Sequence, residues 1–363
     1  MKGEIGLMEL EKLLMELSNG FGPSGFEGEV REIFRRAVSD HADISYDNLG
    51  GIIATHRGNA PEPKILLAAH LDEVGLMVRG ILPSGYLKVV PLGSWFTPTL
   101  LAQEVRVRSK NGVHIGVIGA KPPHYMSEEE RNRPLKFGDL YIDVGVGSRD
   151  EAVALGIEIG NPVAPAVQAA AMSQPGALIG KAFDDRAGCA VIVQLLRELD
   201  HSHPNLVMGA GTVQEENGAK GAHTIAAYTQ PDLCIVLEGT PADDFADAGS
   251  IIQGRLGGGA QIRRFDPSMV ANTALVNLAI EEAQKNGIPY QVTVREGGGT
   301  DGSEIQLHAN GVPTMVIGVP VRYAHSHHGI ISMKDVEATI RLVKALIFKL
   351  DRAVVENIQQ NPW

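Results

Sequence analysis

The chain is poor in the residues that would place it in several classes of protein. It holds 2 cysteines among 363 residues, too few for a disulfide framework. Cys189 and Cys234 lie in apolar surroundings and are predicted to be buried thiols of a reducing compartment. No stretch approaches the roughly 20 apolar residues of a membrane span, and the first 17 residues lack the apolar core of a signal peptide. We therefore expect a cytoplasmic protein that does not contact a membrane.

Positive charge is also in short supply. The chain has 32 Lys and Arg against 43 Asp and Glu, a formal net charge of −11 at pH 7. This balance argues against a nucleic acid as partner, because such proteins carry a basic surface. Hydrophobic residues make up 44% of the chain, enough for a full core, and the length exceeds that of one typical domain. Two domains are the expectation.

The amino-acid composition changes twice along the chain. From Val74 to Ala164 it is rich in β-branched residues, glycine and proline, and Asn111-Gly112 is a strong hairpin signal. Outside this block, helical patterns occur at Glu4–Leu17, Glu27–Val38, Arg186–Leu199, Asn272–Lys285 and Lys334–Ile358. We predict an α/β fold in which residues 1–73 and 165–363 form a catalytic domain, interrupted by an inserted β-rich domain of residues 74–164.

Two adjacent glutamates, Glu215 and Glu216, end an apolar run that has strand character. Consecutive side chains on an extended backbone point to opposite sides. One carboxylate can therefore bind a cation while the other handles a proton. An isolated pair of glutamates is more often a solvated acidic loop, so this interpretation depends on ligand-type residues at the ends of other strands.

Such residues follow other apolar runs. Ile65–Ala69 leads to His70, Leu233–Leu237 to Glu238, and Thr314–Val319 to His325. The first of these runs is wholly apolar, which is typical of a strand buried on both faces. Asp72 follows His70 by two residues and is a candidate partner for the second ring nitrogen of that histidine. Open α/β sheets place ligands beyond the carboxyl ends of their strands.

Asp184 and Asp185 precede the helix that we expect from Arg186. An aspartate at a helix start commonly caps the helix, worth about 1 kcal/mol, so one of the two can cap while the other faces the site. The oxygen and imidazole donors collected in this way are His70, Asp184, Glu215, Glu216, Glu238 and His325. The set holds no thiolate and suits zinc, cobalt or manganese. Its number of carboxylates favours two ions that share a bridging ligand.

At these positions the sequence resembles the tetrahedral aminopeptidases, dinuclear metallopeptidases that include glutamyl and deblocking aminopeptidases. The resemblance rests on five motifs in register across nearly the whole chain: His70–Gly75, Lys181–Gly188, Thr212–Glu216, Gly298–Gly302 and Tyr323–Ser326. It implies a mixed-sheet metallopeptidase domain with an inserted β-rich dimerisation domain. It also implies a hollow homododecamer built from dimers.

The resemblance further implies a role for each site residue. His70, Asp184, Glu216, Glu238 and His325 would hold two divalent ions, with Asp184 as the bridge. Glu215 would serve as general base and then general acid, and Asp72 would support His70. Thr300 and Asp301 would lie near the substrate, although the same dipeptide also has the character of a plain turn. The chain departs from the family pattern in two places: Glu238 stands where many relatives have Asp, and Ser326–Gly329 replaces an acidic stretch.

We therefore expect a metal-dependent aminopeptidase that removes N-terminal residues from short peptides. Carboxylates and two cations can anchor an α-amine and a carbonyl together, whereas the sequence offers no obvious cationic anchor for a C-terminal carboxylate. One alternative is a dinuclear hydrolase of another amide, such as an N-acyl amino acid, or of a glycan. Another is a catalytically silent, metal-bound assembly subunit. Glu215 beside Glu216 argues against the silent subunit, which has no need of a base there.

Overall fold

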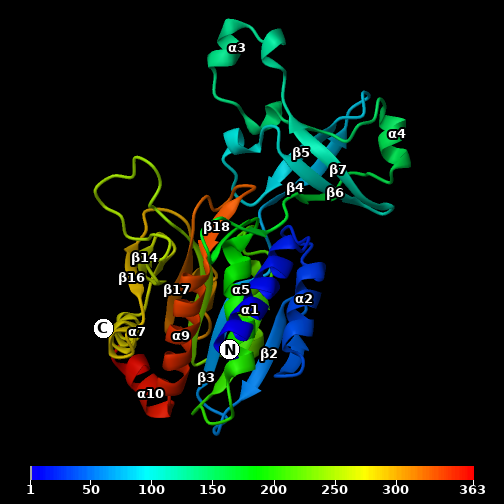
Figure 1. Ribbon diagram of the computed structural model, residues 1–363. Coiled ribbons are helices and arrows are strands. Elements are labelled where there is room, and N and C mark those ends of the chain that lie inside the picture. The colour runs from blue at the N-terminus through cyan, green and yellow to red at the C-terminus, as the bar shows by residue number, and fades with distance from the viewer. Residues whose placement is uncertain (1) are drawn as a thin grey trace.

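The computed structural model describes the backbone of residues 2–363 and the side chains from residue 6 onward. Met1, which the predicted catalytic domain includes, lies outside the described residues. Figure 1 shows a large α/β body that carries both ends of the chain and a smaller β body above it. The α/β fold class predicted from the sequence is confirmed.

A nine-stranded mixed sheet forms the centre of the larger body. In spatial order its strands are β1 (Asp43–Tyr46), β2 (Ile52–Arg57), β12 (Leu206–Thr212), β3 (Lys64–His70), β13 (Leu233–Pro241), β17 (Thr314–Val321), β14 (Ala260–Asp266) and β15 (Met269–Val270), with β16 (Tyr290–Val294) beside β14. The four strands β12, β3, β13 and β17 are parallel to one another. Their carboxyl ends therefore meet at one edge of the sheet.

Helices cover the sheet and bury it. They are α1 (Lys2–Asn19), α2 (Gly28–Val38), α5 (Phe183–Glu198), α6 (Lys220–Thr229), α7 (Thr273–Lys285), α8 (Gly302–Ile305), α9 (Met333–Lys349) and α10 (Arg352–Gln360). α5 packs on β3 and β13 and is apolar nearly all round, because it is the central helix of the core. Within residues 2–363, none of the helices combines the length and the apolar character that crossing a membrane requires.

The predicted helix over Lys334–Ile358 is wrong as a single element. The structure has two helices there, α9 and α10, which are separated at Leu350 and Asp351. The Asp351 side chain accepts a hydrogen bond of 2.9 Å from the backbone N–H of Val354 and so caps the second helix. An N-cap residue has non-helical backbone angles, and the apolar periodicity, which continues across the break, does not reveal it.

A closed barrel forms the smaller body. Its strands are β4 (Gly75–Ile81), β5 (Leu87–Leu92), β8 (Tyr141–Asp143), β7 (Gly112–Gly119), β6 (Glu104–Ser109) and β9 (Pro162–Pro165), in that order around the barrel. β6 and β7 form the hairpin that Asn111-Gly112 predicts. The barrel has a core of its own, and its connections contain α3 (Glu128–Asn132) and α4 (Arg149–Ala154). A further sheet of β10 (Ala170–Ala171), β11 (Ala177–Gly180) and β18 (Gly329–Ser332) lies outside both.

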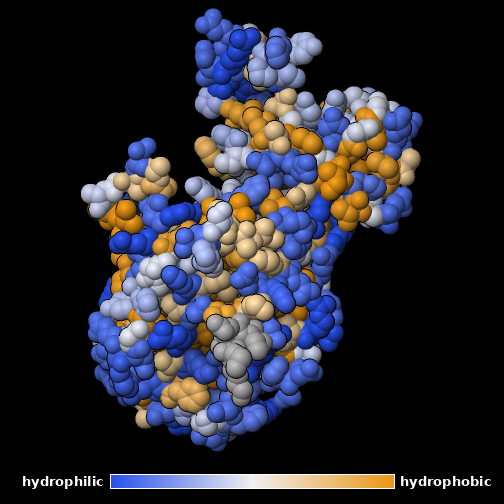
Figure 2. All heavy atoms as spheres, viewed as in Figure 1, coloured by the Kyte–Doolittle hydropathy of each residue, from blue (hydrophilic) through white to orange (hydrophobic). Residues whose placement is uncertain are grey.

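Apolar side chains gather on the visible face of the barrel in Figure 2. Val113, Ile115 and Val117 on β7 are 49%, 56% and 43% exposed. They occupy alternate positions of one strand and therefore share its outer face. Exposed apolar surface of this kind is typical of an interaction surface.

A buried charge network connects three segments near the carboxyl end of β3. Lys181 Nζ lies 2.6 Å from both carboxylate oxygens of Glu73, and neither side chain is more than 1% exposed. Arg186 donates a 2.7 Å hydrogen bond to the carbonyl of Leu17. These contacts fix the end of α1, the residues after β3 and the start of α5 relative to one another.

Candidate active site

The residues predicted from the sequence meet at the carboxyl edge of the parallel strands. β3 ends in His70, β13 contains Glu238, Glu215 and Glu216 follow β12, His325 follows β17, and Asp184 lies at the start of α5. All of them but His70 line one cavity of about 860 Å³, and His70 is buried at 2% exposure. Segments far apart in the sequence thus supply a single site.

Asp184 lies between the two histidines. Its Oδ1 is 3.0 Å from His70 Nε2, and its Oδ2 is 3.3 Å from His325 Nε2. His70 Nε2 also lies 3.4 Å from Glu238 Oε1, and His325 Nε2 lies 3.2 Å from Glu216 Oε1. The side chains therefore form two groups of donors that share one carboxylate.

The electrostatics of the two histidines follow from these contacts. Burial lowers the pKa of His70, but hydrogen bonds to Asp184 and other carboxylates outweigh it and raise the pKa well above its ordinary value. Burial opposes charge on His325 as well, yet hydrogen bonds to Asp184 and Glu216 raise its pKa to about 11. The same two histidines hold the pKa of Asp184 well below its usual range, against the effect of burial.

The other carboxylates are shifted in the opposite direction. Burial, with the nearby charges of Glu238 and other carboxylates, raises the pKa of Glu215 well above its ordinary value. Burial also raises the pKa of Glu238 to about 7 and raises the pKa of Glu216. A cation among these groups favours their ionised forms, so the site is built for positive charge.

The donor set fits divalent metal ions. It offers carboxylate oxygen and imidazole nitrogen, the ligand types that zinc, cobalt and manganese accept. Ligand atoms of His70, Asp184 and Glu216 lie within 4.8 Å of one another. Glu216 Oε1 is buried and lies 3.2 Å from His325 Nε2, so this oxygen and this nitrogen can bind the same cation.

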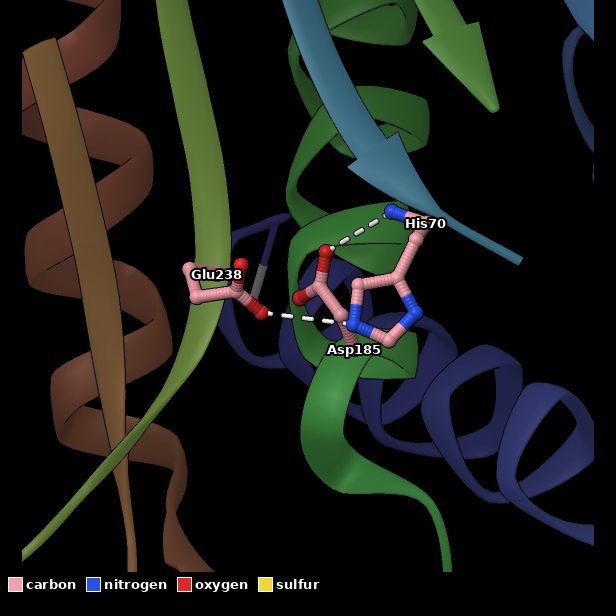
Figure 3. A group of neighbouring side chains, drawn as sticks. All are labelled: His70, Asp185 and Glu238. Atoms are coloured by element: carbon pink, nitrogen blue, oxygen red, sulfur yellow. Dashed lines mark hydrogen bonds and ion pairs between the residues drawn. The ribbon is translucent and has the colours of Figure 1, made fainter. Parts of the chain in front are cut away.

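Asp185 contacts the backbone of His70 and does not line the cavity. Figure 3 shows its carboxylate facing the backbone nitrogen of His70, while the Glu238 carboxylate faces a ring nitrogen of the same histidine. Asp185 Oδ2 accepts a 3.0 Å hydrogen bond from the His70 backbone N–H, and Oδ1 accepts one of 2.9 Å from Gly188. A Cβ at Gly188 would lie 2.5 Å from that carboxylate, so only glycine fits there. Asp184 and Asp185 have non-helical backbone angles within α5, so Asp185 caps the regular part of the helix from Arg186 onward, while Asp184 lines the cavity.

Asp72 contacts the backbone of Glu215 and Glu216 as well as the His70 ring. The carboxylate is fully buried. Its two oxygens each accept a 3.0 Å hydrogen bond, one from the backbone N–H of Glu215 and the other from that of Glu216. Its Oδ1 also lies 3.5 Å from His70 Nδ1. Asp72 therefore orients the backbone of both glutamates as well as a histidine.

Glu215 lies next to His70, but farther from its ring than Asp184 and Glu238 do. Its Oε2 is 3.9 Å from His70 Nε2, and it lines the cavity. Among the two candidate substrate residues, Thr300 lines the cavity as well, whereas Asp301 is 1% exposed and accepts a hydrogen bond from the Thr212 hydroxyl. Asp301 therefore lies behind Thr300 and does not line the cavity itself.

Two arginine side chains line the cavity, and none of the sequence motifs predicted them. Arg263 on β14 donates a 2.9 Å hydrogen bond to Asp266, and Arg295 lies 3.3 Å from Asp243. Burial and the neighbouring charge of Arg263 lower the pKa of Arg295. Only the pairing of β14 with β16 and β17 brings these side chains to the site, and no motif marks that pairing.

The His-rich stretch after β17 divides between two environments. His325 lines the cavity, but His327 is 2% exposed and its ring packs on Trp95, with ring centroids 5.6 Å apart. His327 therefore belongs to the contact with the barrel.

The sequence is similar to a family of aminopeptidases and to individual members of it. The model of the M42 glutamyl aminopeptidase family matches residues 50–342. The lysyl aminopeptidase of Pyrococcus furiosus is 34% identical over 93% of this chain and 97% of its own. The glutamyl aminopeptidase of Lactococcus lactis is 34% identical over 97% of this chain and 99% of its own.

Solved structures agree with the sequence relatives. A TET aminopeptidase from a marine sediment archaeon of the Thaumarchaeota is 38% identical, with a TM-score of 0.94 over 96% of this chain and 98% of that one. The TET1 peptidase of Pyrococcus horikoshii, which can assemble into a tetrahedron or a large octahedral shell, is 31% identical, with a TM-score of 0.83 over 94% and 100%.

Proposed function

The chain belongs to the M42 glutamyl aminopeptidase family and is an aminopeptidase, and from this premise we propose how its site works. Two divalent ions, zinc or cobalt or else manganese, would occupy the site, with Asp184 between them. His70 and Glu238 would hold one ion, and Glu216 and His325 the other. The position of Asp184 between two imidazole–carboxylate groups carries this proposal.

Bound ions would supply Lewis-acid polarisation of the scissile carbonyl. The chain supplies the proton transfer. Glu215 accepts a proton from the attacking water and later delivers it to the leaving amine. The excess of carboxylates also attracts the positive α-amine of a peptide, which orients the N-terminal residue toward the ions.

The arginines suggest a preferred substrate. Arg263 and Arg295 line the same cavity, and guanidinium groups bind carboxylates. We propose that peptides with Asp or Glu at the N-terminus are cleaved best, in line with the name of the Lactococcus lactis relative. Replacing Arg295 with Met should lower kcat/KM for a glutamyl substrate about 10-fold or more, since a charged hydrogen bond contributes roughly 1.5–3 kcal/mol. The loss for a leucyl substrate should be small, and equal losses would exclude this preference.

Assembly is part of the proposal. The segment 74–164 would act as an inserted dimerisation domain, and dimers would build a homododecamer in the cytoplasm. The exposed apolar side chains of Val113, Ile115 and Val117 support such a contact, as does the assembly of the TET1 relative. Sedimentation velocity should show a symmetric oligomer at micromolar concentration. A fully active monomer would refute the assembly.

One experiment separates the aminopeptidase from its rivals. Two otherwise identical peptides, one with a free N-terminus and one acetylated, are followed by mass spectrometry with and without a chelator. We expect stepwise loss of N-terminal residues from the free peptide, slow cleavage of the acetylated one, and no activity after chelation. Equal rates would indicate an acylase, and release from the C-terminus a carboxypeptidase. Activity that survives chelation would show that the reaction does not require a metal ion.

A further inference from the structure

The two central glutamates follow a sharp turn of the backbone. After β12 the chain turns at Gln214, whose φ is +57°. A residue other than glycine adopts this left-handed conformation at a cost and keeps it only where its surroundings hold it. Because Glu215 and Glu216 come next, whatever holds this turn also determines where their side chains point.

A carboxylate from the N-terminal part of the chain binds the turn. Glu27 directly precedes α2 and is 7% exposed. Its Oε1 accepts a 3.1 Å hydrogen bond from the backbone N–H of Gln214 and one of 2.7 Å from that of Gly25. The next two N–H groups, those of Glu215 and Glu216, bind to Asp72. Three successive backbone N–H groups are therefore each held by a buried carboxylate.

The placement of Glu27 is unfavourable for its own charge. Burial and the neighbouring charge of Asp72 raise its pKa to about 7. Carboxylates are rarely buried unless they are well bonded. Here the hydrogen bonds lead to the turn that carries Glu215.

We propose that Glu27 is a positioning residue for Glu215. By binding the N–H of Gln214, it fixes the turn that aims the Glu215 carboxylate at the attacking water. This inference rests on the proposed role of Glu215 as general base. Glu27 itself does not line the cavity, so it acts through the backbone and not by contact with substrate.

A matched control lies two residues further along. Glu29, in the first turn of α2, also accepts a backbone hydrogen bond, of 3.1 Å from Phe21, and pairs with Arg108. It anchors the same helix but binds a different part of the backbone. Loss of Glu29 therefore reports on the contacts of this helix with Phe21 and with β6, without removing the bond to Gln214.

The test compares four single variants with the wild type. Glu27→Ala removes the acceptor, Glu27→Gln keeps an acceptor oxygen without the charge, and Glu27→Asp withdraws the carboxylate from Gln214. Glu29→Ala is the control. For each, kcat and KM are measured with a chromogenic aminoacyl substrate, alongside the metal content and the Tm.

Misplacement of a catalytic group by about 1 Å costs on the order of 100-fold in rate. We expect kcat to fall by about this factor in Glu27→Ala, with KM within about twofold and the metal content unchanged. Glu27→Asp should be slow as well, and it carries the test if the alanine variant does not fold. Glu27→Gln should recover most of the rate, and Glu29→Ala should leave kcat within about twofold of wild type.

Three results would overturn the inference: wild-type kcat in Glu27→Ala and Glu27→Asp, a glutamine variant as slow as the alanine variant, or an equal loss in Glu29→Ala. Glu215→Gln, measured in parallel, separates this failure from that of the proposed base. If Glu215→Gln is inactive while Glu27→Ala is fully active, only the positioning role fails. If Glu215→Gln still turns over, the base assignment fails.

Discussion

Replacing Asp72 with Asn should impair catalysis far more than the small change in size suggests. The two carboxylate oxygens of Asp72 receive the backbone N–H groups of Glu215 and Glu216, each at 3.0 Å. An asparagine has one oxygen that can accept. Its NH₂ group would face the second N–H, and two donors would then meet inside a fully buried site.

The magnitude follows from the cost of that unpaired donor. A buried donor without a partner costs about 1–3 kcal/mol, and each 1.36 kcal/mol is tenfold in rate. If the strain is felt in the position of Glu215, kcat should fall by about 5- to 150-fold. The His70 ring, whose Nδ1 lies 3.5 Å from Asp72, would also lose a charged neighbour. Loss of such a partner typically weakens metal binding about 10- to 100-fold.

Asp47→Asn is the matched control. Asp47 Oδ1 likewise accepts hydrogen bonds from successive backbone N–H groups, those of Leu49, Gly50 and Gly51, in the loop between β1 and β2. Steady-state kinetics, metal affinity and urea unfolding are measured for both variants. Asp72→Asn should lose stability, kcat and metal affinity, whereas Asp47→Asn, which keeps the one oxygen that accepts all three bonds, should change none of them strongly. Wild-type kinetics in Asp72→Asn, or an equal kinetic loss in Asp47→Asn, would refute the reasoning.

Two further predictions concern stability. Burial lowers the pKa of His56 to about 4, and its Nδ1 shares a 2.8 Å hydrogen bond with His203 Nε2. In the unfolded chain the His56 imidazole has a pKa of about 6.5, so it binds a proton at a higher pH than in the folded protein. The free energy of unfolding should therefore fall as the pH drops from 6.5 toward 4. His56→Gln should show a smaller drop in Tm over that range, and an equal drop would contradict the assignment. Lys181→Met should lower the free energy of unfolding by about 3–5 kcal/mol, because it breaks the buried pair with Glu73. The double variant Lys181→Met/Glu73→Gln should lose less than the sum of the single losses in urea unfolding, and strict additivity would argue against the pair.

The sequence predicted those parts of the site that local pattern determines. His70 and Glu238 stand at the ends of apolar runs, and buried parallel strands of that composition bring their ends to one edge. The split between Asp184 and Asp185 was likewise open to prediction from helix capping, and Asp185 does cap the regular part of α5 from Arg186 onward. The family resemblance added the set of motifs that spans the chain.

Contacts across long sequence separations were beyond the reach of such patterns. Arg263 reaches the cavity through strand pairing, and Glu27 reaches Gln214 across 187 residues. Asp72 was expected to support His70, yet its bonds to two backbone N–H groups depend on where the chain turns after β12. No periodicity encodes the left-handed φ of Gln214. The break between α9 and α10 was hidden because apolar spacing continues through Leu350.

Glu215 has the central role in the proposed mechanism. Glu215→Gln keeps the size of the side chain and removes its ability to accept a proton, while the proposed metal ligands stay in place. Metal content and turnover are measured on the same preparation. Loss of a general base lowers the rate by about 10²–10⁴-fold, so we predict a fall of that size with the metal content of the wild type. A variant that loses its metal ions would show Glu215 to be a ligand, and one that keeps wild-type turnover would show that it is not the base.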